Sequence, residues 1–156
     1  MAPEPSSDLI FQFERDFAGS LRCIPMAVRL KLDQCGVKVS LRQWSRFDHD
    51  DRARLLAAPC DGADGGAYRQ QLVELIRLRT GQEAEYLPIE PHPPWEDTQR
   101  VPEQIQQFAA NNGVPAPDLE QWRALTVLQR FALLKLSRAK HDNVNFVPAL
   151  HEFGLA

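Results

Sequence analysis

The chain has 156 residues, of which 44% are apolar, and its formal net charge is −3 with a pI near 5.8. This composition is typical of a compact globular protein, and it lacks the basic excess that binding to a phosphate backbone requires, so nucleic acid is not expected as a partner. No apolar run approaches the ~18 residues of a membrane span, and the N-terminus MAPEPSSD has no signal-peptide pattern, so we expect a cytoplasmic protein without membrane contact.

Proline and glycine bound two predicted helices of equal length. Proline is tolerated in the first turn of a helix, and glycine is favoured just after the last turn. The stretch IPMAVRLKLDQCGV runs from Pro25 to Gly36, and VPEQIQQFAANNGV runs from Pro102 to Gly113. Both stretches carry apolar residues at helical spacing, and their prolines are 77 residues apart.

Two further stretches share a Gln-Trp pair, SLRQWSRFDHDDR at 40–52 and DLEQWRALTVLQR at 118–130. Each opens with a residue that can cap a helix and has Gln three positions later, which is the pattern of a capping box. Trp44 and Trp122 are 78 residues apart, as are Arg52 and Arg130. Capped amphipathic helices have similar sequences in any protein, and this similarity alone could explain the matching caps and leucines. It explains the repeated Gln-Trp pair less well. Several matching residues that are all separated by 77 or 78 positions predict an internal duplication of the sequence.

These patterns predict an all-α fold, a helical bundle of about eight helices that forms a single domain over residues 1–156. Four helices fall in each of two pseudo-repeated units, residues 20–80 and 101–154. The apolar stretch from Val127 to Ala139 is expected to be a central helix. Segment 82–100 joins the units, and its four prolines between positions 88 and 94 favour an extended path over a helix.

Motifs for catalysis or metal binding are missing from the sequence. The three Cys and four His form no CxxC, HxxxH or HExxH spacing, so we expect no metal or iron–sulfur site. Cys23, Cys35 and Cys60 are odd in number and widely spaced, which indicates reduced thiols. There is no GxSxG elbow, and PCDGADGG lacks the Gly-Lys-Ser ending of a phosphate-binding loop. We therefore expect no catalytic residues and no cofactor.

Polar side chains on or between the predicted helices are the candidates for partner binding. Arginine on an apolar helix is a common interface residue, although it can also be a structural residue whose stem lies along the helix surface. The densest polar stretch is SRAKHDNVNF at 137–146, where His and Asn side chains either line a small site or cap two helices. The candidate residues are Arg22, Arg29, Arg130, Arg138, His141 and Asn145.

Three stretches, FQFERDF, LRCIPMAVRLKLDQCGVKVSLRQW and LQRFALLKLSRAKHDNVNFVPALHEFGL, resemble the nitrate reductase-associated protein family. These are small bacterial proteins linked with assimilatory nitrate reductase. The resemblance covers nearly the whole chain and is weakest at 61–66 and 82–100. It implies a non-catalytic accessory factor that contacts nitrate reductase and helps it to reach or keep its active form. The molybdenum and iron–sulfur cofactors would then belong to the partner, and the family supplies no functional residues to transfer.

A second function stays open, that of a small-ligand-binding or catalytic helical domain with a pocket near His141 and Asn145. Helix bundles hold such sites between their helices. A deep polar pocket near His141 would favour this function, whereas a surface with exposed apolar and arginine residues would favour the accessory factor. The sequence leaves the oligomeric state open, and also whether the partner is an apo-enzyme, a cofactor carrier or an electron donor.

Overall fold

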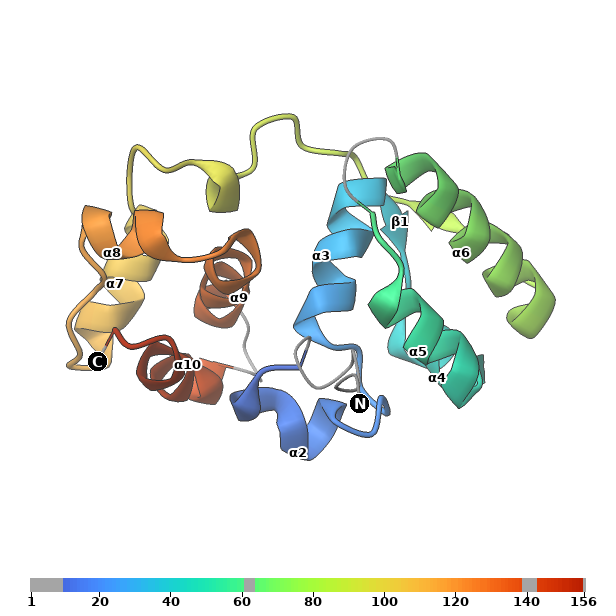
Figure 1. Ribbon diagram of the computed structural model, residues 1–156, viewed down its shortest axis with the longest axis horizontal. Helices are drawn as coiled ribbons and strands as arrows, with labels where there is room; N and C mark the ends of the chain where they lie inside the picture. The colour runs from blue at the N-terminus through green and yellow to red at the C-terminus, as the bar shows by residue number, and fades with distance from the viewer. Residues whose placement is uncertain (1–9, 61–63, 139–142, 156) are drawn as a thin grey trace, which may run out of the picture. The chain divides into compact units, whose positions relative to one another are not determined.

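The computed structural model describes residues 10–60, 64–138 and 143–155. Contacts divide the chain into two compact units, unit 1 with residues 1–90 and unit 2 with residues 91–156. Helix predominates in both, and the described residues form a single sheet of two short strands (Figure 1), which confirms the predicted all-α class. None of the described helices combines the length and apolar character that crossing a bilayer requires. The unit boundary falls inside segment 82–100, while the single domain made of two repeats stays a prediction.

Unit 1 is built mainly from four helices and the short turns before them. Its helical elements in chain order are η1 (Gln12–Glu14), α2 (Arg15–Ala18), α3 (Met26–Cys35), α4 (Leu41–Arg46), α5 (His49–Ala57) and α6 (Asp64–Thr80). Helix α3 packs against α5 and α6, and α4 also contacts α6. The largest fully buried side chains of this unit are Trp44, Leu55, Leu56, Tyr68, Leu72 and Ile76.

Helix α3 has the proline and glycine boundaries that the sequence predicts. Pro25 precedes it in an extended conformation, and Gly36 follows it with a φ of 73°. Proline has no side-chain oxygen for a cap, and a buried carboxylate supplies one instead: Glu14 Oε1 accepts a 3.0 Å hydrogen bond from the N–H of Met26. The first N–H groups of a helix lack partners within it and favour negative charge, so Glu14 ties η1 to the start of α3.

The segment after α3 pairs with the start of the predicted linker. Strand β1 (Val37–Lys38) runs antiparallel to β2 (Glu85–Tyr86). Gly36 lies at the close approach of these segments, because a Cβ atom there would be 2.7 Å from Ile89 Cγ1 and 2.9 Å from the carbonyl oxygen of Leu87. The extended path expected for segment 82–100 therefore includes a short strand that belongs to unit 1.

Unit 2 is arranged around α9, as its apolar sequence predicts. Its elements in chain order are η2 (Pro94–Glu96), α7 (Glu103–Asn111), α8 (Leu119–Ala124), α9 (Val127–Arg138), η3 (Asn143–Asn145) and α10 (Phe146–Glu152). Helix α9 contacts α7, α10 and η2, and most of its side chains are buried. The turn η2 departs from the fully extended path expected for 82–100. Prolines fit there because the first positions of a helical turn need no N–H donor.

The two Gln-Trp stretches form the same capping box at the start of α4 and of α8. In α4 the Ser40 hydroxyl accepts a 3.1 Å hydrogen bond from the N–H of Gln43, whose side chain accepts one in return from the Ser40 N–H. In α8, Asp118 and Gln121 make the same pair of bonds at 2.8 and 2.9 Å. Both predicted capping boxes are thus present.

The tryptophans of the two stretches also have matching environments. Trp44 and Trp122 are both fully buried. Their Nε1 atoms donate 2.8 Å hydrogen bonds to main-chain oxygens of segments that lie earlier in the chain, those of Leu21 and Asp97. These likenesses are local, and the duplication itself stays a prediction.

Candidate functional site

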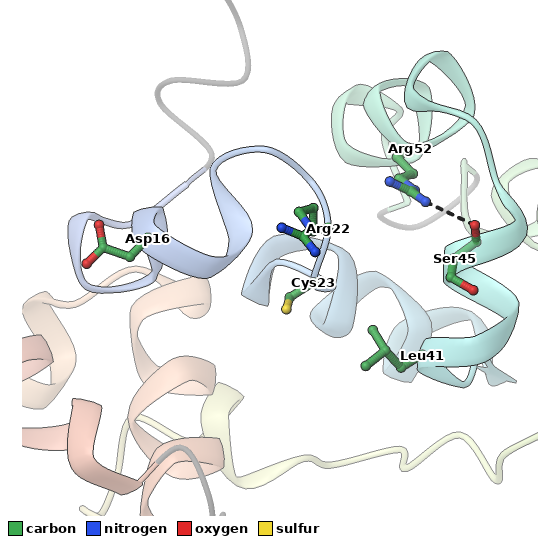
Figure 2. Close-up of a pocket in the computed structure, with 6 residues that line it drawn as sticks. All are labelled: Asp16, Arg22, Cys23, Leu41, Ser45 and Arg52. Atoms are coloured by element: carbon green, nitrogen blue, oxygen red, sulfur yellow. Dashed lines mark hydrogen bonds between the residues drawn. The ribbon is translucent and has the colours of Figure 1, made fainter.

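An open pocket of about 550 Å³ lies in unit 1 (Figure 2). Its walls come from α2, from the segment before α3, and from α4 and α5, with the lining residues Asp16, Arg22, Cys23, Leu41, Ser45 and Arg52. The volume is within the range of ligand-binding pockets. Of the candidate residues from the sequence, Arg22 lines this pocket, and it is exposed there.

The backbone immediately before Arg22 is in a strained conformation. Leu21 has a φ of 63°, in the left-handed region that costs an L-residue about 1–2 kcal/mol. Its side chain is buried, its N–H donates a 2.9 Å hydrogen bond to the Ala18 oxygen, and its oxygen accepts the bond from Trp44. These contacts hold the turn that brings Arg22 to the pocket. Because such outliers cluster at functional sites, the strain marks this segment as a candidate.

Arg52 extends from α5 into the same pocket, across from Arg22. Its Nε donates a 3.2 Å hydrogen bond to the Trp44 oxygen, and its Nη2 donates a 3.2 Å bond to the Ser45 oxygen (Figure 2). Its guanidinium carbon lies 5.9 Å from the centre of the Trp44 ring. Since Trp44 is itself buried and hydrogen-bonded, the Arg52 guanidinium is held in one orientation by a rigid part of the unit.

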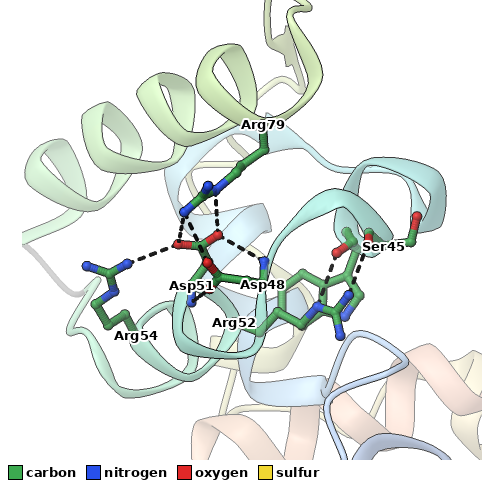
Figure 3. Close-up of polar contacts among 7 residues, drawn as sticks. Ser45, Asp48, Asp51, Arg52, Arg54 and Arg79 are labelled. Atoms are coloured by element: carbon green, nitrogen blue, oxygen red, sulfur yellow. Dashed lines mark hydrogen bonds and ion pairs between the residues drawn. The ribbon is translucent and has the colours of Figure 1, made fainter.

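A buried carboxylate fixes the first turn of α5, from which Arg52 extends (Figure 3). The Asp51 side chain is fully buried and accepts hydrogen bonds from Arg79 Nε at 2.8 Å, Arg54 Nη2 at 3.0 Å and the Asp48 N–H at 3.0 Å. Burial raises the pKa of Asp51, but the bonds from Arg79 and Asp48 and the charge of Arg79 together outweigh it. The pKa of Asp51 therefore lies below its usual value.

Arg130, a candidate from the sequence, has a structural role instead. The residue is buried, with an exposed fraction of 6%. Its Nε donates a 2.6 Å hydrogen bond to the Trp95 oxygen, and its Nη1 donates to the oxygens of Leu125 at 2.6 Å and Trp122 at 3.3 Å. Burial lowers the pKa of Arg130, which a charge on Glu96 partly offsets. Main-chain carbonyls satisfy this cation, so it is not available to a partner.

The other candidates are spread over both units. Arg29 is half-buried on α3, and its Nε donates to a main-chain oxygen of the preceding segment. Arg138 is exposed at the end of α9, where its Nε donates a 2.9 Å hydrogen bond to Gln104 Oε1 of α7. Asn145 precedes α10, is partly exposed and makes no side-chain cap bond. His141 lies outside the described residues, so the alternative function with a pocket near His141 and Asn145 stays untested.

Sequence reasoning missed Arg52 as a site residue, although it matched Arg52 with Arg130. Both arginines follow a tryptophan by eight residues, and in the structure each donates a hydrogen bond to the main-chain oxygen of that tryptophan. Nothing in the spacing distinguishes the arginine that lines a pocket from the buried one. Leu41 and Ser45 were also missed, because exposed positions of a short helix carry no distinguishing pattern.

Two buried thiols, Cys35 at the end of α3 and Cys60 after α5, form a separate cluster. Cys35 Sγ is 3.7 Å from the Leu32 oxygen, and Cys60 Sγ is 3.4 Å from the oxygen of Lys31. A hydrogen bond with Cys60 lowers the pKa of Cys35, which burial alone would raise. The three cysteines are free thiols, and no group of three or more His, Cys, Asp or Glu among the described residues is placed to hold a metal ion.

The chain was compared with known protein families, with curated proteins and with solved structures. The model of a family described as conserved nitrate reductase-associated protein matches residues 10–153. That range includes every residue of the unit 1 pocket and all helices of unit 2. Neither a search of curated proteins nor a search of solved structures found a match.

Proposed function

Because the chain belongs to the conserved nitrate reductase-associated protein family, we propose that it is a non-catalytic accessory factor of assimilatory nitrate reductase. It supports the maturation or the activity of the enzyme through protein–protein contact. The family match over residues 10–153 is the observation that carries this proposal. The cofactors of the reductase belong to the partner.

The unit 1 pocket is consistent with binding rather than with nucleophilic chemistry. The Ser45 hydroxyl donates a 2.6 Å hydrogen bond to the Arg42 oxygen, and no histidine lines the pocket within the described part of the chain. An activated serine instead needs a hydrogen-bonded base. Leu41 lines the same pocket as the two arginines and is 58% exposed, and arginine with exposed apolar side chains is a common composition of contact surfaces.

The contact with the reductase is expected to be transient. An accessory factor that serves many enzyme molecules has to dissociate from each of them, and a micromolar dissociation constant corresponds to about 8 kcal/mol of binding free energy. Most differences in affinity between related complexes come from the dissociation rate. Rapid exchange is thus compatible with a specific contact.

A clean deletion of the gene tests the proposal. The deletion strain should contain nitrate reductase polypeptide at the level of the parent strain, as measured by immunoblot, but only a small fraction of its activity. A plasmid copy of the gene should restore that activity. The purified protein by itself should not reduce nitrate with any electron donor that the reductase accepts.

Normal nitrate reductase activity in the deletion strain would contradict the proposal. So would turnover of nitrate by the purified chain. A loss of reductase polypeptide together with its activity would indicate a role in synthesis or protection of the enzyme, and would contradict the role in maturation or activity.

A further inference from the structure

We propose that Arg22 and Arg52 bind a carboxylate side chain of a partner polypeptide, with Arg52 as the anchoring residue and Leu41 in contact with an apolar neighbour of that carboxylate. That the polypeptide is nitrate reductase rests on the proposed function. The chemistry of the pocket does not depend on it, because it follows from the lining residues themselves.

Arg52 and Arg130 occupy similar positions after a tryptophan, but Arg52 is the one that can bind a ligand. Both follow a buried tryptophan by eight residues and donate a hydrogen bond to its main-chain oxygen. Arg130 makes further bonds to the oxygens of Trp95 and Leu125 and is almost fully buried. Among the described residues, Arg52 donates only to the oxygens of Trp44 and Ser45, and it is partly exposed in an open pocket. The same local framework therefore leaves part of the Arg52 guanidinium free for a ligand.

The free part of Arg52 is already oriented before any ligand binds. Two main-chain bonds and the Trp44 ring hold the guanidinium, and Asp51 fixes the turn of α5 that carries it. A side chain that is fixed beforehand loses less entropy when it binds than a mobile surface arginine does. On the other side of the pocket, the strained backbone at Leu21 sets the position of Arg22. The two arginines thus come from parts of unit 1 that are held in place.

The charge of the pocket is opposite to the charge of the whole chain. Its lining contains two guanidinium groups and one carboxylate, that of Asp16, which gives a sum of +1, whereas the chain carries −3. Neither Arg22 nor Arg52 has a carboxylate within 4.0 Å in the described part of the chain. Ion pairs instead involve other arginines, such as Arg79. An excess positive charge without an internal partner favours an anionic ligand.

A carboxylate on a polypeptide fits this pocket better than a small free anion. Guanidinium groups bind carboxylates through two parallel hydrogen bonds, which gives geometric specificity. The pocket of about 550 Å³ is open and far larger than a small anion, and Leu41 offers an exposed apolar surface. An acidic side chain with an apolar neighbour would use both features.

Side-chain NMR of the full chain labelled with ¹⁵N tests the carboxylate directly. The probe is the peptide acetyl-Leu-Glu-Leu-amide, and its matched control is acetyl-Leu-Gln-Leu-amide, which differs only in the charge. The Glu peptide should shift the Nε–H signal of Arg52 and the amide signals of Arg22 and Ser45, while the Gln peptide should leave them unchanged. Sodium acetate and sodium nitrate at the same concentration serve as small free anions.

Arginine variants distinguish this pocket from general surface charge. Arg52→Gln should weaken binding of the Glu peptide by about tenfold or more, because it removes a charge-assisted bidentate contact, and Arg22→Gln should weaken it by a smaller factor. Arg46→Gln is the matched control, since Arg46 is an exposed arginine of α4 that does not line the pocket. It should change the affinity by less than about twofold. Circular dichroism checks that each variant is folded.

Three results would overturn the inference. The first is the absence of any signal shift with the Glu peptide up to about 20 mM, a concentration far above a millimolar dissociation constant. The second is an equal shift with acetate or nitrate. The third is a loss of peptide affinity in Arg46→Gln that equals the loss in Arg52→Gln. The gene deletion separates this inference from the proposed function. Normal reductase activity without the gene, together with peptide binding, rejects the function and keeps the pocket. If the deletion strain loses reductase activity, and the Arg52→Gln gene restores that activity as fully as the Arg46→Gln gene does, the proposed function stands. Arg52 is then rejected as the anchoring residue of the contact.

Discussion

The indole Nε1 of Trp44 donates a 2.8 Å hydrogen bond to the main-chain oxygen of Leu21, a residue whose φ is 63°. Both residues are buried, so without this bond a strained turn would also contain an unpaired carbonyl. The bond links α4 to the segment that carries Arg22. It therefore connects the stability of unit 1 to the geometry of the pocket.

Replacing Trp44 with Phe should destabilise unit 1 by about 1–3 kcal/mol beyond the loss of packing, because the Leu21 carbonyl remains buried without its donor. Trp95→Phe is the matched control, since Trp95 is also buried but its Nε1 has no hydrogen-bond partner in the described part of the chain. Urea unfolding followed by circular dichroism measures both changes. Equal costs for the two variants would show that the hydrogen bond of Trp44 contributes nothing.

Gly36→Ala should cost clearly more than Gly113→Ala, although both glycines follow a helix and have a positive φ, 73° and 67°. The left-handed backbone alone costs about 1–2 kcal/mol in either variant. At Gly36 the added Cβ would also meet Ile89 and the Leu87 carbonyl, whereas at Gly113 it would meet nothing within 4 Å. The difference in the free energy of unfolding between the variants measures the close approach of the segment after β2.

Asp51→Asn should destabilise the chain at neutral pH by about 2–3 kcal/mol, the scale of hydrogen bonds to a buried charged group. The folded-state pKa of Asp51 is lowered, so this contribution is fully present above about pH 5 and is lost as pH falls below the ordinary value of about 4. Unfolding midpoints of the variant and the unchanged protein should therefore converge in acid. A gap that stays constant down to pH 2 would contradict the charged role of Asp51.

Arg54→Gln is the control for the same cluster. Arg54 also bonds to Asp51, but its side chain is 66% exposed. Exposed ion pairs contribute about 0–1 kcal/mol, so this variant should unfold almost as the unchanged protein does. A cost as large as that of Asp51→Asn would indicate that Arg54, rather than Arg79, holds the carboxylate.

Arg130→Met should destabilise unit 2 by about 2–4 kcal/mol, because it removes the donor to several buried carbonyls at once. Arg52→Met should cost less, since Arg52 makes fewer main-chain bonds and is partly exposed. Urea unfolding measures both. The effects on binding of the Glu peptide should be opposite, with a larger loss of affinity in the Arg52 variant than in the Arg130 variant.

Cys23 should be the thiol that reacts first with a thiol reagent such as dithiobisnitrobenzoate. It is partly exposed in the pocket, whereas Cys35 and Cys60 are 3% and 4% exposed. About one equivalent should therefore react rapidly in the native state, and the remaining two should react in denaturant. The adduct at Cys23 should also block binding of the Glu peptide. Rapid reaction of all three thiols would contradict the burial of the other pair.

Local signals in the sequence determined most of the helices. The helix between Pro25 and Gly36, the capping boxes at Ser40 and Asp118 and the apolar helix α9 depend on the chain's own neighbours within one or two turns, and all of them are present in the structure. The resemblance to the nitrate reductase-associated family was likewise visible in the sequence, and the family match confirms it.

Tertiary structure alone decided which polar residues remain available to a partner. Arg52 and Arg130 have the same spacing from a tryptophan, but a turn that contributes the Trp95 oxygen covers only Arg130. Glu14 caps α3 from twelve residues away, and Leu21 is held in a left-handed conformation by a tryptophan far along the chain. The spacing of residues in the sequence indicates which of them share a helix face. Their burial and hydrogen-bond partners depend on segments that are distant in the sequence. The pocket lined by Arg22 and Arg52 is therefore evident only in the folded chain.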